Sequence, residues 1–503
     1  MVVTGKRLAL QAAFFLAFTV PAVFSQDNSG AESHRAKELM AEHQFAEAIP
    51  IYKKLLKAYP ENTGLLLNLA LAEQMAGQPA RAIPHFESVL KTEPDNVPAL
   101  LSLSMARLQL SQSGEAIAPL EKVLKLDPEN LDAVGMLAEA ELNQGSFEEA
   151  AEHYRELTAR SGADPRAWYG LGKAYESLAT RTFARLSQTA PESSYVAILL
   201  AETSLQRHRY RSAFFFYREA QSKSSDLPGI HAGLAEVYKN TDHADWAAAE
   251  KQREETLPRP DCRVQTPECA FLSQDFLAVT KSATTKANPE TLFWVTKAYN
   301  ELAVQTFDRL SQLPESVEIH ALKAQILHDH KQDLEAANEW RAALNLAPGD
   351  PRIERQLALA LFDAKDYRSA MPLIEKQLAR EPKAADLNYL MGASLFRTEQ
   401  AEKALPYLRL AVGGHADVLA ADAALGLTLV ALNKSAEAIP YLKKALPLDD
   451  DGSVHYSLAR AYRSAGETQL ASDTMQQYQK IQRQNQEINS QLAKEAEITA
   501  PSR

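Results

Sequence analysis

The stretch FAEAIPIYKKLLKAYPEN, residues 45–62, returns 34 residues later as PARAIPHFESVLKTEPDN and after a further 34 as SGEAIAPLEKVLKLDPEN. In the first copy Ala48 is followed by Tyr52, Leu55 and Pro60, and the later copies keep these spacings. Residues at positions i, i+4 and i+7 lie on one face of a helix, and the proline ends that helix. The stretch therefore predicts an amphipathic helix that recurs at a fixed period.

A second helix precedes each of these helices, with Leu66, Leu69 and Ala70 on its inner face in one copy. Turn residues such as those at 77–79 separate the two helices. A hairpin of two helices leaves one apolar face uncovered, so it has to stack on a neighbouring hairpin. The period therefore predicts an all-α solenoid.

The clearest motif combines the spacing W-x2-L-G-x2-Y with a later A-x3-F and a following Pro. Its first half is complete at Trp168, Leu171, Gly172 and Tyr175. This pattern resembles the tetratricopeptide repeat (TPR) proteins, of the type exported by bacteria, and about a dozen units cover residues 32–482. The resemblance implies a right-handed superhelical solenoid of helix-turn-helix repeats.

Two units depart from the regular period in the same way. They begin at Pro165 and Pro289, and in each the alanine of the second helix, Ala179 or Ala303, arrives early. Because no turn residue interrupts the apolar stripe, each unit is predicted to be one long helix of about 24 residues. A hairpin closed by a tight turn is the alternative.

These irregular units divide the chain into blocks. Because their starts are 124 positions apart, a longer unit of that length, which we call the superrepeat, is predicted to be duplicated. The predicted blocks are a signal segment (1–25), N-terminal repeats (26–164), a first superrepeat copy (165–288), a second copy with the C-terminal repeats (289–482), and a polar cap helix and tail (483–503). The first copy includes a proline-containing linker, 257–276, that lacks clean repeats.

Both cysteines, Cys262 and Cys269, lie in this linker. In an exported protein such a pair is typical of a local disulfide, worth about 2–3 kcal/mol. A pair of reduced bystanders and a functional pair are the alternatives. No Cys or His flanks the two closely enough to suggest a zinc site, and redox catalysis prefers the spacing C-x-x-C.

Residues 1–25 have the layout of a secretory signal peptide. Lys6 and Arg7 precede an apolar core over residues 8–20, and Ser25 ends a cleavage site. An uncleaved anchor is the alternative, although the apolar run is shorter than the roughly 20 residues that a membrane span needs. We expect an exported protein, periplasmic or secreted, with no stable membrane span after cleavage.

Composition and motifs argue against several classes of function. With a net charge of −11 the chain lacks the positive field that attracts nucleic acid, so no nucleic-acid partner is expected. No P-loop, GxGxxG, GxSxG or HExxH motif occurs, and we predict no enzyme activity, no cofactor and no metal site. His328 and His330 point about 200° apart on a helix, so they cannot chelate an ion together. The basic string 207–211 is assigned to a solvated turn, with contact to an anionic partner as the alternative.

The resemblance implies that partners bind along the concave face, which in this family is lined by the first helix of each unit. Mapping the signature spacing onto this sequence gives apolar and aromatic candidates with two lysines among them: Leu67, Leu71, Leu101, Met105, Leu108, Tyr169, Lys173, Phe293, Lys297, Phe362, Tyr389, Phe396 and Tyr456. Such a lining suits an extended or helical peptide better than a sugar phosphate or a nucleic acid.

The predicted function is therefore that of a non-enzymatic scaffold in the cell envelope that binds a protein or peptide partner. A scaffold for assembly or secretion of an envelope polymer and a binder of small ligands inside the superhelix are the alternatives. An enzyme with its site grafted onto the array would need a non-repeat domain of about 100 residues or more, and the sequence contains none. The partner and the oligomeric state stay open.

Overall fold

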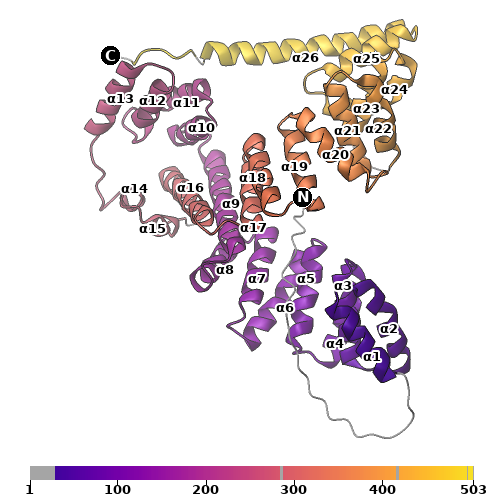
Figure 1. Ribbon diagram of the computed structural model, residues 1–503. Coiled ribbons are helices and arrows are strands. Elements are labelled where there is room, and N and C mark those ends of the chain that lie inside the picture. The colour runs from indigo at the N-terminus through magenta and orange to yellow at the C-terminus, as the bar shows by residue number, and fades with distance from the viewer. Residues whose placement is uncertain (1–28, 284–286, 415–418, 496, 502–503) are drawn as a thin grey trace. The chain divides into compact units, whose positions relative to one another are not determined.

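The structure, a computed structural model, describes residues 29–283, 287–414, 419–495 and 497–501. Within these ranges the chain forms 26 α-helices, one short 3-10 helix (Leu446–Leu448) and no strand. Within residues 29–160, 194–256 and 317–495 consecutive helices pack as hairpins, and each hairpin contacts the next (Figure 1). This architecture confirms the predicted all-α repeat fold. The predicted signal segment, 1–25, lies outside the described residues.

The contacts divide the chain into two units, and we describe each by itself. Unit 1 contains α1 (Ser29–Ala41), α2 (Phe45–Ala58), α3 (Thr63–Met75), α4 (Pro79–Thr92), α5 (Val97–Gln109), α6 (Ser113–Leu126), α7 (Leu131–Gln144), α8 (Phe147–Arg160), α14 (Thr266–Leu272) and α15 (Phe276–Thr280). Unit 2 contains α10 (Ser194–Gln206), α11 (Tyr210–Lys223), α12 (Ile230–Lys239), α13 (Ala244–Thr256), α17 (Val317–Asp329), α18 (Asp333–Leu346), α19 (Pro351–Asp363), α20 (Tyr367–Leu378), α21 (Ala385–Arg397), α22 (Ala401–Gly413), α23 (Leu419–Ala431), α24 (Ser435–Ala445), α25 (Ser453–Ser464) and α26 (Thr468–Glu495). Two long helices, α9 (Pro165–Thr189) and α16 (Pro289–Ser311), contribute residues to both units.

A residue with left-handed backbone closes the hairpin turns at a fixed repeat position. In the N-terminal repeats it recurs every 34 residues with φ of 59°, 76°, 60° and 85°, at His43, Gly77, Ser111 and Gly145. The next N–H reaches back five residues, as from Gln78 to the carbonyl of Glu73 at 2.8 Å. This is the Schellman pattern, which satisfies carbonyls at the end of the first helix.

The first helix of each N-terminal hairpin begins at an asparagine cap. Asn62, Asn96 and Asn130 are again 34 residues apart, and each side chain accepts a hydrogen bond from the N–H three residues later, at 2.9–3.0 Å. Such caps stabilise a helix start by about 1 kcal/mol each. The Pro-x-Asn sequence that recurs in the chain thus ends one hairpin and starts the next.

The recurring apolar residues form the core between the helices. Ala48, Tyr52 and Leu55 are at most 3% exposed, and Phe86, which corresponds to Tyr52 in the next repeat, is fully buried. Burial of one such large side chain stabilises the fold by roughly 1.5–3 kcal/mol. The predicted helical face is therefore the face that packs.

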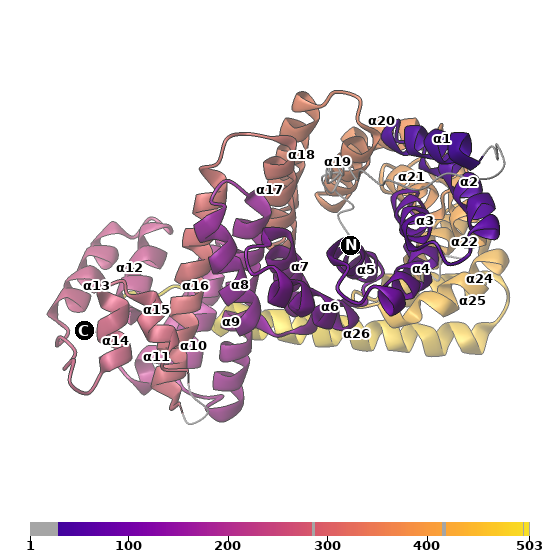
Figure 2. The same cartoon turned by 90° about the horizontal axis from the view of Figure 1, so that it is seen from below.

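The two irregular units are single long helices. α9 has 25 residues and α16 has 23, which confirms the single-helix prediction over the tight-turn alternative. The two helices lie side by side within unit 1 (Figure 1 and Figure 2). The rings of Tyr175 and Tyr299 are 6.2 Å apart, and Gly172 lies against Phe307. The two copies of the duplicated unit thus pack on each other.

The linker that holds both cysteines contains one short helix, α14, after an irregular stretch. Both cysteines are disulfide-bonded, and because the chain has only two, Cys262 is joined to Cys269. The bond ties the irregular stretch to the middle of α14.

The C-terminal helix α26 begins as the second helix of the last hairpin and continues to residue 495. Its side chains cover the turn before α25, where Gln482 donates to the carbonyl of Asp451 at 2.7 Å. The polar stretch predicted as a cap from residue 483 is the second half of this helix, because no breaker separates it from the last repeat.

Candidate functional site

Successive first helices contact one another along the array. In unit 1, α3 contacts α5 and α5 contacts α7, and in unit 2, α19 contacts α21, α21 contacts α23 and α23 contacts α25. Successive second helices make no comparably extensive contact among the described residues. The first helices therefore lie on the tighter side of the curve in each unit, and we call their exposed side the first-helix face.

In unit 1 the N-terminal candidates divide into exposed and buried residues. Leu67 and Leu71 on α3 and Leu101 and Met105 on α5 are half-buried and remain on the surface. Leu108 is only 7% exposed, so its placement in the groove was wrong. It lies in the last turn of α5, where it belongs to the core cluster that α6 and α7 complete.

The candidates on the two long helices are not equivalent. Tyr169 and Lys173 are half-buried, and the Nζ of Lys173 lies 2.7 Å from the carboxylate of Glu176. Phe293 is 1% exposed, with its ring 5.1 Å from that of Tyr195. Phe293 is therefore a core residue, and its prediction as a groove residue was wrong because α10 covers it.

Lys297 corresponds to Lys173 one superrepeat later, and its surroundings are aromatic. Its Nζ lies 5.5 Å from the ring centre of Phe271 and 5.8 Å from that of Trp294, within range of cation–π attraction. The lysine thus covers the aromatic contact between α14 and α16.

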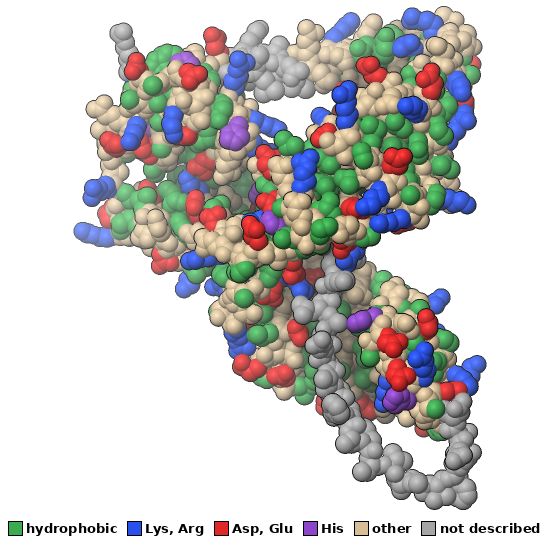
Figure 3. Space-filling model, in the orientation of Figure 1, with side chains coloured by type: hydrophobic (Ala, Val, Ile, Leu, Met, Phe, Trp, Pro, Cys, Tyr) green, Lys and Arg blue, Asp and Glu red, His purple; other side chains and the backbone are tan. Residues whose placement is uncertain are grey.

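In unit 2 the candidates form an aromatic patch, which we define as Phe362, Tyr389 and Phe396. All three are half-buried, and they rim the core formed by α17–α25. The rings of Phe362 on α19 and Tyr389 on α21 meet edge to face at 5.9 Å, so the patch bridges two repeats. Burial raises the pKa of the Tyr389 hydroxyl, which keeps its proton. Figure 3 shows hydrophobic side chains gathered over the α19–α23 part of unit 2.

Tyr456, the last candidate, is 42% exposed on α25. Its ring lies 5.3 Å from Tyr478 on α26, and the guanidinium of Arg460 lies 5.9 Å from its centre. The C-terminal helix α26 therefore contacts the ring of Tyr456 and covers part of the surface around it.

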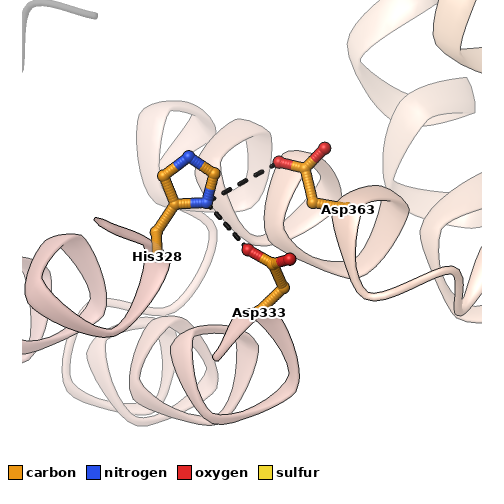
Figure 4. A group of neighbouring side chains, drawn as sticks. All are labelled: His328, Asp333 and Asp363. Atoms are coloured by element: carbon orange, nitrogen blue, oxygen red, sulfur yellow. Dashed lines mark hydrogen bonds and ion pairs between the residues drawn. The ribbon is translucent and has the colours of Figure 1, made fainter. Parts of the chain in front are cut away.

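One side-chain cluster in unit 2 has donors that could hold a divalent cation. The Nδ1 of His328 lies 2.9 Å from Asp333 Oδ1 and 3.9 Å from Asp363 Oδ2 (Figure 4). Burial raises the pKa of Asp363, and the nearby carboxylate of Asp333 adds to the rise. His328 and Asp333 already share a hydrogen bond, so these two side chains are partnered without a cation.

The spacing of His328 and His330 in the sequence did not predict this cluster. The signal that could have revealed it is the repeat itself, because residues about one period apart lie side by side on stacked first helices. His328 lies in the last turn of α17, and Asp363, 35 positions later, ends α19.

A second feature is a cavity of about 750 Å³ in unit 2, lined by the basic string around Arg209 and by residues of the C-terminal segment. Residues 207–209 of the string lie in the turn between α10 and α11, and Tyr210 and Arg211 begin α11. All members of the string except Tyr210 are exposed.

Comparison with known families agrees with this geometry. Tetratricopeptide repeat models match residues 35–96, 67–130, 107–174, 355–418 and 423–486, which together make up more than half of the chain. The chain belongs to the tetratricopeptide repeat family. The matched ranges leave out 175–354, the part of this TPR array that holds most of α9, the cysteine linker and α16.

Solved TPR structures resemble parts of the chain. A TPR protein from Parabacteroides merdae is 12% identical over 66% of this chain and 99% of its own, with a TM-score of 0.31. MamA is 21% identical over 40% of this chain and 94% of its own, with a TM-score of 0.29. YrrB, described as a TPR protein with an unusual peptide-binding site, is 21% identical over 35% of this chain and 92% of its own, with a TM-score of 0.29. No curated protein matches the chain.

Proposed function

We propose that this TPR protein is a non-enzymatic scaffold that binds an extended or helical peptide segment of a partner protein on its first-helix face. TPR proteins bind protein or peptide partners, and the array offers a surface of that kind in each unit. The aromatic patch is the observation that carries the proposal.

The patch has the properties of an anchor site for apolar side chains. Rings that are half-buried present a large apolar area while their packing fixes their orientation, so little side-chain entropy is lost on binding. Aromatic residues of this kind supply most of the binding energy in many protein interfaces. A partner segment with apolar residues at spacings of a helix turn or of alternate strand positions would fill the patch.

We further propose that the scaffold works outside the cytoplasm, in the periplasm or as a secreted protein. The signal-like sequence at 1–25 and the disulfide between Cys262 and Cys269 support this location, because stable disulfides form in oxidising compartments. No helix among the described residues is long and apolar enough to cross a membrane.

The test is a selection of peptides from a random display library on the intact protein. Peptides enriched on the wild type are then titrated against Tyr389→Ala and against Tyr407→Ala, a matched control on the second helix α22. Tyr407 is also half-buried and packs against the same core. We expect Tyr389→Ala to weaken binding by about tenfold or more and Tyr407→Ala by less than about threefold. Enriched peptides that bind both variants equally would refute the role of the patch.

A further inference from the structure

The C-terminal segment of the chain lies against the hairpin α12–α13 within unit 2. The hydroxyl of Tyr238 donates a hydrogen bond to the backbone carbonyl of Thr499 at 2.7 Å, across 261 positions of sequence. α26 leads the chain to this place, and residues 497–501 form neither helix nor strand (Figure 1). The repeat array thus holds a non-helical segment through its backbone.

Tyr238 is a rigid donor. Its side chain is fully buried, and its ring lies 5.9 Å from Phe214 on α11 and 5.5 Å from Trp246 on α13. Burial raises the pKa of Tyr238 to about 12, so the hydroxyl keeps its proton at neutral pH. A donor that is fixed in this way can bind the backbone of any segment that reaches it, whatever its side chains.

The charges around the segment add selectivity. Glu497 and Ile498 line the cavity described above together with Arg209, Arg211, Thr241 and His243. Arg209 and Arg211 are exposed, and neither forms an ion pair with an acidic side chain in the part of the chain that the structure describes. Glu497 therefore lines the same cavity as two exposed arginines, and the half-buried Ile498 lines it next to Glu497. Guanidinium groups select carboxylates by charge and by paired hydrogen bonds.

We propose that this cavity is a second peptide-binding site, which takes an extended segment with an acidic residue followed by a branched apolar residue. The C-terminal segment 497–501 occupies the site as an internal competitor. The site lies at the turns of α10–α13 and does not depend on the aromatic patch or on the first-helix face.

This competition should raise the apparent dissociation constant of an added peptide by a measurable factor. A segment tethered to its own site acts at an effective concentration of about 1 mM or more. If the free segment binds with a dissociation constant of about 100 μM, the tether raises the apparent dissociation constant of an added peptide about tenfold. A partner in solution therefore binds well only when its contacts exceed those of the segment or when the segment is displaced.

The probe is a fluorescent peptide with the sequence of residues 494–503, KEAEITAPSR. The host is the full chain with Glu497→Lys and Ile498→Ser, whose own segment has lost its carboxylate and its apolar side chain. Fluorescence anisotropy should show binding to this host that is at least about tenfold tighter than to the unsubstituted chain. A chain that ends at Glu495 is a second host and should behave in the same way.

Two further substitutions in the host separate the site from general attraction. Arg209→Glu with Arg211→Glu should weaken peptide binding by about tenfold or more. Lys239→Glu with Lys251→Glu, an equal charge change at exposed positions of α12 and α13, should change it by less than about threefold. The proposal would be overturned if neither host bound the peptide, or if both hosts bound it only as tightly as the unsubstituted chain does. It would also be overturned if the two charge-reversal variants lost peptide affinity equally. Each of these results leaves the first-helix face untouched.

Discussion

Gly172 of α9 lies directly against the ring of Phe307 of α16. A Cβ atom at Gly172 would be 2.2 Å from Cε1 of that ring, far inside contact distance. The two long helices therefore approach each other at a position that only glycine permits, although they are separate copies of one duplicated unit.

Gly172→Ala is expected to destabilise unit 1 by about 1–3 kcal/mol, because the Phe307 ring has to leave its place. Alanine otherwise favours a helix over glycine by about 0.5–1 kcal/mol, so a clash is needed to reverse the sign. Urea unfolding checks the prediction. Gly30→Ala on α1, where nothing lies within 4 Å, is the control and should be neutral or stabilising. Equal stability of Gly172→Ala and wild type would contradict the helix contact.

Substitutions at two equivalent left-handed turn positions should change the stability of the array in opposite directions. Glu399 has φ 63°, and glycine adopts this conformation without strain, so Glu399→Gly should stabilise the array by about 0.5–1 kcal/mol. Gly77 has φ 76°, and a Cβ atom added there would meet no atom within 4 Å, so Gly77→Ala should cost about 1 kcal/mol through the backbone alone. Thermal unfolding of both variants is the measurement. Changes of the same sign would disprove the shared turn geometry.

Glu250 of α13 is fully buried and accepts hydrogen bonds from His231 of α12 and, at 2.8 Å, from Arg253. Glu250→Ala leaves the buried imidazole without its partner, and we expect a loss of about 3 kcal/mol in the free energy of unfolding. Replacing both members of the pair, by His231→Leu with Glu250→Met, should recover most of that loss. The midpoints of urea unfolding are the measurement. If Glu250→Ala were as stable as wild type, the pair would contribute nothing to the stability of the fold.

His153 of α8 is hydrogen-bonded to the carboxylate of Glu141 at 2.7 Å, and this bond raises the pKa of His153 above its usual 6.5. Because the folded pKa is raised, the stabilisation is complete below pH 6.5 and is lost as the pH rises through the raised value. Wild type should therefore exceed His153→Gln in stability by about 1 kcal/mol at low pH, and the difference should shrink above pH 6.5. Urea midpoints across this range test it, with His34→Gln on exposed α1 as control. A difference that grows with pH would reverse the assignment.

Local patterns in the sequence were enough to predict the repeats and the two long helices. The spacing of Ala48, Tyr52 and Leu55 places these residues on one face of a helix. After Tyr175 no helix-breaking residue occurs at the expected turn, so the sequence favours a continuous helix. These features depend on neighbours within a few residues, so one sequence contains them.

The exposure of side chains on the surface of the array depends on contacts between residues that are distant in the sequence. It was therefore predicted less well from the sequence than the helices were. Phe293 occupies the repeat position of an exposed residue, but Tyr195, almost 100 positions earlier, covers it. No sequence pattern links Tyr238 with Thr499, so their hydrogen bond could not be predicted. The two residues meet because α26 leads the chain to this place. Repeat register predicts which face a residue occupies, whereas its exposure depends on what packs over that face.

The most direct test of the scaffold function is a photocrosslinking experiment at the first-helix face. A benzophenone amino acid replaces Tyr389 in one variant and Tyr407 in another, and each is irradiated with a peptide selected on the wild type. Binding at the aromatic patch predicts a strong crosslink from position 389 and little or none from position 407. Crosslinks of equal yield from both positions, or from position 407 alone, would contradict binding on the first-helix face.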